Sequence, residues 1–159
     1  MRLNNRNKIG YFNFLSTLLV MISLFGVLIF LLERYKYHYL GWGAAIFVVI
    51  PFLLAIVFYL RGRQIFEFDS DGEALNFKNK NVFLFLDRPL SDEFPKYKLM
   101  SYEILNAFIF KRLYIKITSK KNNSVTLRYD VSYLTKKELN DLKFSLSKVI
   151  KTNKERENS

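Results

Sequence analysis

The sequence predicts an α+β protein: a two-helix transmembrane hairpin, then a small antiparallel β-sheet or barrel of about five to seven strands, capped by a C-terminal amphipathic helix. Three observations support this prediction. Apolar residues make up half of the chain and concentrate in its first 60 residues. After Arg63, apolar and polar residues alternate, as they do in strands with one buried face. Near the C-terminus the apolar spacing changes to that of a helix.

Two long runs in the N-terminal part of the chain carry no formal charge. The first covers about residues 9–32 and the second about residues 39–60. Both exceed the roughly 18 residues above which an apolar run indicates a membrane span rather than a core helix. The first run is too long for a signal peptide and no small-residue cleavage site follows it. Residues 1–62 are therefore expected to form a membrane anchor.

Basic residues flank the outer ends of the two runs and are expected to set the topology: Arg2, Arg6, Lys8, Arg61 and Arg63. The segment that connects the runs carries only Arg34 and Lys36. Cytoplasmic loops of membrane proteins hold an excess of Lys and Arg. We therefore expect a multi-pass protein of the cell (inner) membrane with both termini in the cytoplasm.

Small residues near the start of the second run predict a place where two helices approach closely. Gly41 and Ala45 lie one helical turn apart, and such small residues let helix backbones come together in membranes. Packing within the hairpin is the simpler interpretation. Packing between two copies of the chain, which would make a homo-oligomer, is the alternative.

Residues 63–150 are expected to form a cytoplasmic β domain. The segment 65–77, IFEFDSDGEALNF, has two alternating stretches around an Asp-Gly turn and predicts a hairpin. Similar alternation predicts strands at 100–104, 113–118 and 125–131. Two short apolar runs, 82–86 and 107–110, fit either further buried strands or loops that contact the membrane.

One amphipathic helix is expected to close the domain. Thr135 and Glu138 have the spacing of a capping box, which satisfies backbone N–H groups at a helix N-terminus. Leucines at helical spacing follow, so the sequence predicts a helix over residues 136–150. Residues 151–159 are polar and are expected to form a disordered tail.

This order of elements resembles bacterial proteins that place two transmembrane helices ahead of a pleckstrin-homology-like (PH-like) domain. The resemblance rests on the two apolar runs, the hairpin 65–77, the segment EFPKYKL at 93–99 and the segment SYLTKKELNDL at 132–142. It implies a PH-like fold and a role in lipid or protein recognition. The first turn, Ser70-Asp71-Gly72-Glu73, is acidic, whereas phosphoinositide-binding PH domains carry basic residues there.

The sequence offers little basis for catalysis, and we expect neither an enzyme nor a cofactor or metal site. The chain has no cysteine, and its single histidine, His38, lies between the two apolar runs. A nucleophile therefore has no histidine base in the β domain. The adjacent carboxylates Asp92 and Glu93 are expected to be solvated in a loop. The net charge of +11 fits attraction to an anionic lipid leaflet, and no nucleic-acid partner is expected.

One segment of the β domain combines bulky apolar residues with cations, as membrane-surface contacts do: Phe108, Ile109, Phe110, Lys111 and Arg112. We expect a membrane-anchored, non-catalytic binding module that presents its β domain at the cytoplasmic face to a protein or a lipid. Its partners would be the lipid bilayer and a membrane protein or a second copy. The alternative is a regulatory or assembly subunit of a larger membrane complex, and a less favoured third class is an enzyme that acts on lipids.

Overall fold

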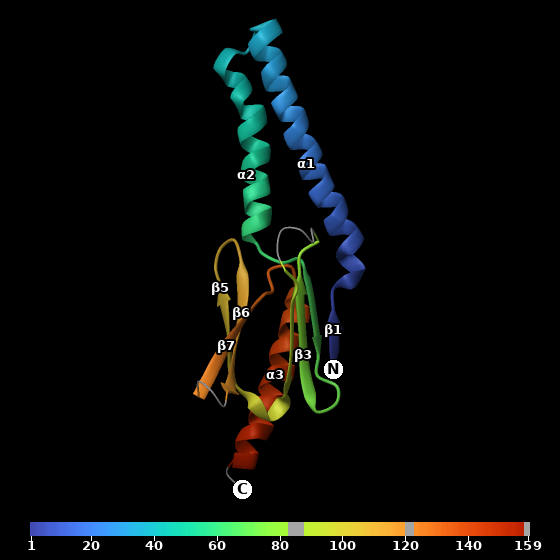
Figure 1. The fold of residues 1–159 in the computed structure, drawn as a ribbon, viewed down its shortest axis with the longest axis vertical. Coiled ribbons are helices and arrows are strands. Elements are labelled where there is room, and N and C mark those ends of the chain that lie inside the picture. The colour runs from blue at the N-terminus through green and yellow to red at the C-terminus, as the bar shows by residue number, and fades with distance from the viewer. Residues whose placement is uncertain (83–87, 120–122, 158–159) are drawn as a thin grey trace. The chain divides into compact units, whose positions relative to one another are not determined.

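The computed structural model describes residues 1–82, 88–119 and 123–157, and the chain divides into two compact units (Figure 1). The β unit consists of Met1–Ile9 and Arg61–Ser159, and the helical unit consists of Gly10–Leu60. The helical unit is thus inserted into the sequence of the β unit. This division differs from the expected anchor over residues 1–62, because the first nine residues belong with the β unit.

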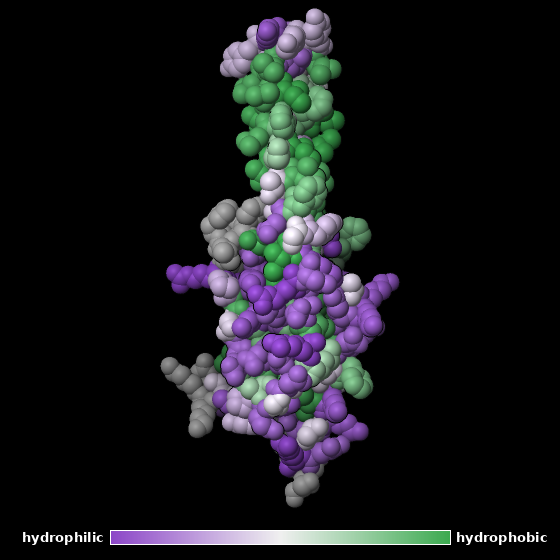
Figure 2. Space-filling view, turned by 90° about the vertical axis from the view of Figure 1, so that its right-hand side faces the viewer, coloured by the Kyte–Doolittle hydropathy of each residue, from purple (hydrophilic) through white to green (hydrophobic). Residues whose placement is uncertain are grey.

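The helical unit contains two long apolar helices. Helix α1 covers Ile9–Leu32, which matches the first predicted run, and α2 covers Ile46–Leu60. Short helical segments, Glu33–Tyr37 and Gly41–Ala45, lie between them. With these segments included, both helices are long and apolar enough to cross a membrane. On the face shown in Figure 2, hydrophobic residues cover this unit, whereas the β unit is largely hydrophilic.

The two long helices lie close to each other at Gly26 of α1. A Cβ atom on Gly26 would lie only 1.9 Å from the backbone oxygen of Phe47, so no larger residue fits without movement.

The connecting segment is closed by Glu33, whose carboxylate accepts hydrogen bonds from the backbone N–H groups of Leu40 and Gly41. Glu33 is buried, and these bonds offset part of the cost of burying its charge.

Among the described residues of the β unit, seven strands form two antiparallel sheets. The first sheet has the order β1-β2-β3-β4 and the second the order β5-β6-β7. Their bounds are β1 Arg2–Asn4, β2 Ile65–Asp69, β3 Ala74–Lys80, β4 Leu90–Pro95, β5 Leu99–Asn106, β6 Lys111–Ser119 and β7 Asn123–Asp130. The α+β class is confirmed at this level.

Strand β1 precedes the helical unit and pairs with β2, which follows it. Leu3 lies opposite Phe68 and is buried in the core. Asn5 extends this pairing, because its side chain donates to the backbone oxygen of Gln64 and accepts from the N–H of Phe66, at 2.7 and 2.8 Å. The expected order of an anchor followed by a domain therefore needs correction. A three-residue strand is too short to show a pattern, and its partner lies more than 60 residues away.

The predicted hairpin of segment 65–77 is confirmed as β2 and β3. Phe68 lies opposite Phe77, and both side chains are buried. In the turn, Gly72 has φ of +72°, a left-handed conformation that glycine adopts without steric cost. The backbone N–H of Asp71 donates to the Asp69 carboxylate at 2.9 Å, which is the local bonding typical of aspartate in turns.

The two sheets and helix α3 (Lys136–Glu157) enclose one hydrophobic core. Aromatic rings fill its centre, where Phe77 stacks on Tyr129 with ring centroids 4.9 Å apart. The helix contributes three leucines, Leu139, Leu142 and Leu146. The capping box is confirmed, because the Thr135 N–H donates to Glu138 and the Glu138 N–H donates to the Thr135 hydroxyl.

Helix α3 is longer than the sequence predicts. It continues to Glu157, through most of the segment that was expected to be a disordered tail. Lys, Glu and Arg have high helix propensity, so the polar composition does not oppose a helix here. The side chain of Asn153 also donates to the backbone oxygens of Lys96 and Leu99, at 2.8 and 3.0 Å, and this holds the last turns against the rest of the unit.

Of the two ambiguous apolar runs, residues 83–86 of the first lie outside the described residues. The second, 107–110, is not a strand but the loop between β5 and β6.

Candidate functional site

The β5–β6 loop presents its largest apolar side chain to the surroundings. Phe108 is fully exposed, and Ile109 is 40% exposed. The loop is nevertheless tightly closed, because the N–H of Ala107 donates to the oxygen of Phe110 at 2.9 Å. The predicted apolar residues are therefore brought together at the tip of a short, hydrogen-bonded loop rather than in the core.

The base of this loop is tied to the segment where the chain leaves α2. The N–H of Lys111 donates to the hydroxyl of Ser132 at 2.9 Å, and that hydroxyl donates to the backbone oxygen of Arg61 at 2.6 Å. The guanidinium of Arg61 lies over the ring of Tyr133, 4.9 Å from its centroid. Arg61 directly follows Leu60, the last residue of α2. The exposed loop thus lies beside Arg61, the residue at which the chain enters the β unit after α2.

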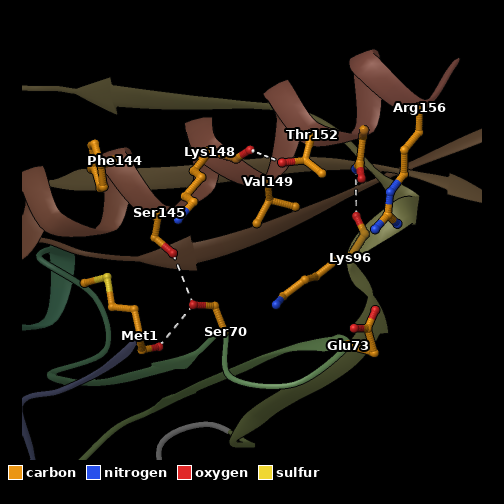
Figure 3. A pocket seen from close by; sticks show the side chains of 11 residues that line it. Met1, Ser70, Glu73, Lys96, Phe144, Ser145, Lys148, Val149, Thr152 and Arg156 are labelled. Carbon is orange, nitrogen blue, oxygen red and sulfur yellow. Dashed lines mark hydrogen bonds between the residues drawn. The ribbon is translucent and has the colours of Figure 1, made fainter. Parts of the chain in front are cut away.

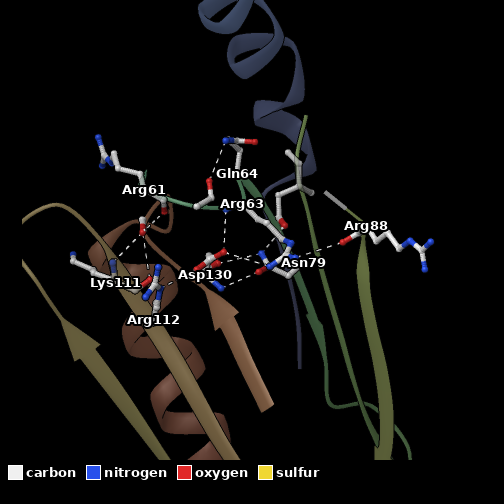
Figure 4. A network of polar contacts seen from close by, with 11 residues as sticks. Arg61, Arg63, Gln64, Asn79, Arg88, Lys111, Arg112 and Asp130 are labelled. Atoms are coloured by element: carbon white, nitrogen blue, oxygen red, sulfur yellow. Dashed lines mark hydrogen bonds and ion pairs between the residues drawn. The ribbon is translucent and has the colours of Figure 1, made fainter. Parts of the chain in front are cut away.

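A buried carboxylate, Asp130 at the end of β7, organises this end of the unit (Figure 4). It lies 3.5 Å from Nη1 of Arg63 and 3.4 Å from Nε of Arg112, and it accepts from the backbone N–H of Arg63 at 3.2 Å. The Nε of Arg112 makes no hydrogen bond, so its contact with Asp130 is an ion pair without hydrogen-bond geometry. One carboxylate therefore joins the chain after α2 to strands of the second sheet.

The turn that contains Gly62 depends on the same carboxylate. Gly62 has φ of +82°, and a Cβ atom there would lie 2.4 Å from Cγ of Asp130. Any side chain at this position would meet both backbone strain and a buried neighbour. The segment Arg61-Gly62-Arg63, expected to set topology, is therefore also part of the packing of the β unit.

Asn79 of β3 connects the two sheets at this point. Its side chain accepts from the N–H of Asp130 at 2.8 Å and donates to the backbone oxygens of Asp130 and Ile65, at 3.1 and 3.0 Å. Asn79 is fully buried, and all these contacts satisfy polar groups that would be costly to bury alone. No sequence pattern points to this role, because Asn79 and Asp130 are 51 residues apart.

Among the predicted contact residues, Arg112 also makes contacts within the β unit. Its guanidinium pairs with Asp130 and lies over the ring of Phe110, 4.2 Å from the centroid. Both Arg112 and Phe110 are partly buried. The exposed part of the predicted surface therefore consists of Phe108 and Ile109, with Lys111 at its edge.

The N-terminal basic residues lie in the β unit, each next to an acid. Arg2 lies 3.5 Å from Asp69, Arg6 lies 3.4 Å from Glu67, and Lys8 lies 3.2 Å from Glu138. These contacts fix strand β1 and the short segment before α1, Arg6–Lys8, to β2 and α3.

The last of these contacts changes the titration of Glu138. Partial burial acts to raise the pKa of Glu138, but hydrogen bonds from Thr135 and Lys8 and the charge of Lys8 outweigh it and hold the pKa below its usual value.

The predicted packing residues lie in the segment before α2. Gly41 has open space around the position of a Cβ atom, and Ala45 is partly buried, whereas its neighbour Ala44 is fully buried. A close approach of the two helices lies at Gly26. A glycine near the middle of an apolar run is the signal that could have found it.

The adjacent carboxylates Asp92 and Glu93 lie in β4 rather than in a loop. Asp92 accepts a hydrogen bond of 2.7 Å from the hydroxyl of Tyr129, whose ring is in the core. Burial, together with this hydrogen bond, raises the pKa of Tyr129 far above its usual value.

Within residues 1–82, 88–119 and 123–157, no group of three or more His, Cys, Asp or Glu side chains could hold a metal ion.

Comparison of the chain with protein-family models, with curated proteins and with solved structures found no match in any of the three.

Proposed function

We propose that this chain is a membrane-anchored, non-catalytic binding module whose β unit is held at the cytoplasmic surface of the cell (inner) membrane. Two antiparallel sheets closed by a C-terminal helix are the layout expected of a PH-like domain, and this layout supports that part of the proposal. The ligand would be a protein or a lipid at the membrane. Tethering raises the local concentration of the module there, so weak contacts suffice.

The low burial of the two apolar helices supports the membrane anchor. Only 11% of the most apolar part of each helix is buried within the molecule. A core helix of a soluble protein would be mostly buried, and a helix that is apolar on all sides needs an apolar environment. A cleaved signal sequence is also disfavoured for α1, because cleavage after it would remove β1, whose Leu3 lies in the core.

The insertion of the helical unit supports the hairpin topology. Strands β1 and β2 pair with each other, so the two ends of the helical unit return to the same sheet and must lie on the same side of a membrane. Two spans satisfy this requirement. The flanks hold Arg6, Lys8, Arg61 and Arg63, and this excess of Lys and Arg over the connecting segment supports a cytoplasmic location for that side.

The single observation that carries the surface contact is the exposure of Phe108 at the loop tied to Arg61. Since Arg61 follows the last apolar residue of α2, it lies at headgroup depth when α2 spans the bilayer. The hydrogen bonds through Ser132 keep the loop at that end of the β unit. An exposed phenylalanine at this depth gains by entering the interface, and Lys111 adds attraction to anionic lipids of about 1 kcal/mol.

The test uses the full-length chain in vesicles. Trp42 is replaced by phenylalanine to remove the one native tryptophan. Phe108→Trp is then compared with Phe144→Trp, which is 73% exposed on α3. In vesicles with brominated anionic lipids, we expect quenching and a blue shift for tryptophan at 108 but not at 144. Equal quenching at the two positions, or none at 108, would refute the contact.

The subunit alternative is favoured by one observation. Gly41 and Gly43, at the start of the second apolar run, have nothing within 4 Å of the position of a Cβ atom. Such open glycines could receive a helix of another membrane protein. Isolation of the chain in mild detergent tests this: one stoichiometric integral membrane partner, lost in Gly41→Leu, would favour a subunit of a complex, whereas the module would be isolated alone.

A further inference from the structure

A cavity of about 370 Å³ lies between α3 and the turn that follows β2 (Figure 3). Two hydrogen-bonded contacts hold its walls. Ser70 and Ser145, both buried, join the turn to α3 through a hydroxyl–hydroxyl contact of 3.2 Å. Further along α3, Asn153 donates to the backbone oxygen of Lys96 at 2.8 Å. The cavity is thus built by two fixed walls, and its volume is within the usual range of about 300–1,000 Å³ for small-molecule sites.

The charges that line the cavity are unbalanced. Lys148 and Arg156 project from α3, and Lys96 faces them from the opposite wall, whereas Glu73 is the one acidic side chain among the lining residues. The lysine and the arginine on α3 are about two helical turns apart, and both line the cavity. In the described part of the chain, no ion pair includes any of these three cations. The site therefore has an excess of two positive charges.

The hydroxyl groups of the cavity already have acceptors, so the cations are the donors that remain. Thr152 donates to the backbone oxygen of Lys148 at 3.1 Å, and Ser70 donates to the backbone oxygen of Met1 at 3.1 Å. Lys96 donates one proton to the backbone oxygen of Gly72 and keeps two. Beside the cations lie the apolar side chains of Val149 and Phe144.

We propose that this cavity binds a soluble phosphate monoester, an inference that goes beyond the membrane-anchored module itself. A phosphate monoester carries about −1.5 to −2 charges at neutral pH, which matches the excess positive charge of the lining. The phosphoryl group lies between Lys148, Arg156 and Lys96, and the organic part lies against Val149 and Phe144. A ligand from solution is favoured over a lipid headgroup, because the turn at 70–73 is at the opposite end of β2 from the connection to α2.

The experiment uses the full-length chain in nanodiscs of uncharged phosphatidylcholine. Calorimetric titration compares phenyl phosphate with inorganic phosphate and phenol. We expect phenyl phosphate to bind more tightly than either, because only it combines the charge with an apolar group. Lys148→Gln with Arg156→Gln should weaken its binding by about tenfold or more, the loss expected for one charge-assisted hydrogen bond.

A matched control makes the same change of charge at residues of α3 that do not line the cavity. Lys151→Gln with Lys154→Gln removes two exposed cations outside the cavity and should change the affinity by less than about twofold, as expected for diffuse screened charge. Equal losses in the two double variants, or no binding of phenyl phosphate, would overturn the proposal. Displacement of phenyl phosphate by phosphatidic acid in the nanodisc would overturn the assignment to a soluble source. None of these results affects the tryptophan quenching at residue 108.

Discussion

The two units use the same apolar residue types in opposite ways. In the helical unit, phenylalanine, leucine, isoleucine and valine side chains point outwards, and few residues of α1 and α2 are buried. In the β unit, the same types form one core enclosed by two sheets and α3. The difference shows that composition alone does not decide burial. The environment of each unit does, and an apolar exterior indicates a lipid environment just as an apolar core indicates water.

The largest expected effect comes from removing one aromatic ring from the core of the β unit. This change tests whether the two units differ in the burial of their apolar residues. Phe77 is fully buried and stacks on Tyr129 and Phe94. Phe77→Ala should lower the free energy of unfolding of the β unit by about 3–5 kcal/mol. Urea unfolding followed by hydrogen exchange of the β3 amides measures this. Phe52→Ala, at a position 63% exposed on α2, is the matched control and should have little effect on that unit. Similar losses in the two variants would contradict the assignment of burial.

The next effect concerns the ion pairs of Asp130 within the β unit. Asp130→Asn keeps the size of the side chain but removes the charge that faces Arg63 and Arg112. Leaving the buried guanidinium of Arg63 and the partly buried one of Arg112 without their carboxylate should cost about 3 kcal/mol in the unfolding of the β unit. Glu103→Gln, at an exposed position of β5, removes a charge without such contacts and should cost less than about 0.5 kcal/mol. If the two variants lose the same free energy of unfolding, the carboxylate of Asp130 does not stabilise the β unit through its ion pairs.

A smaller effect is expected inside the helical unit. Gly26→Ala places a methyl group against the backbone of Phe47, so the helices must separate at a cost of about 1–3 kcal/mol. Titration with sodium dodecyl sulfate in mixed micelles, followed by the fluorescence of Trp42, reports the unfolding of this unit. Gly10→Ala adds the same group in open space and serves as the control. Unchanged unfolding in Gly26→Ala would mean that the helices do not pack at this position.

The smallest effect is a dependence on pH. The pKa of Glu138 is lowered in the folded state, so its contribution to stability is present above its ordinary value of 4.5 and is lost as the pH falls through the lowered value. Glu138→Gln keeps the capping geometry but not the charge. We expect the variant to be less stable than the parent at pH 7 and equally stable once Glu138 is protonated. A difference that stays constant over the acid range would exclude the charge of Glu138 as its cause.

The elements that the sequence predicts correctly depend on local patterns. Helix α1 and the β2–β3 hairpin follow from an unbroken apolar run and from alternation around an Asp-Gly turn. The capping box of Thr135 and Glu138 is likewise a contact between near neighbours. These features are readable because one short segment contains all the residues that they need.

The features that the sequence does not reveal depend on contacts between distant segments. Strand β1 is stable because Asn5 and Leu3 contact residues that follow the helical unit in the sequence, and Asp130 accepts a hydrogen bond from Arg63, 67 positions away. Helix α3 extends past Ile150 because Asn153 is bound to the segment before β5. The loop at 107–110 was ambiguous, since an apolar run of four residues fits a strand or an exposed tip equally well.

The central claim is that the two helices cross a membrane and leave both parts of the β unit on one side. Because the chain has no cysteine, single cysteines at Asn7, Tyr39 and Asn140 can report this through a membrane-impermeant maleimide. In inverted vesicles, we expect Asn7→Cys and Asn140→Cys to be labelled and Tyr39→Cys to be protected. In spheroplasts, we expect the reverse pattern of labelling. Labelling of Tyr39→Cys from the same side as Asn140→Cys would contradict the claim.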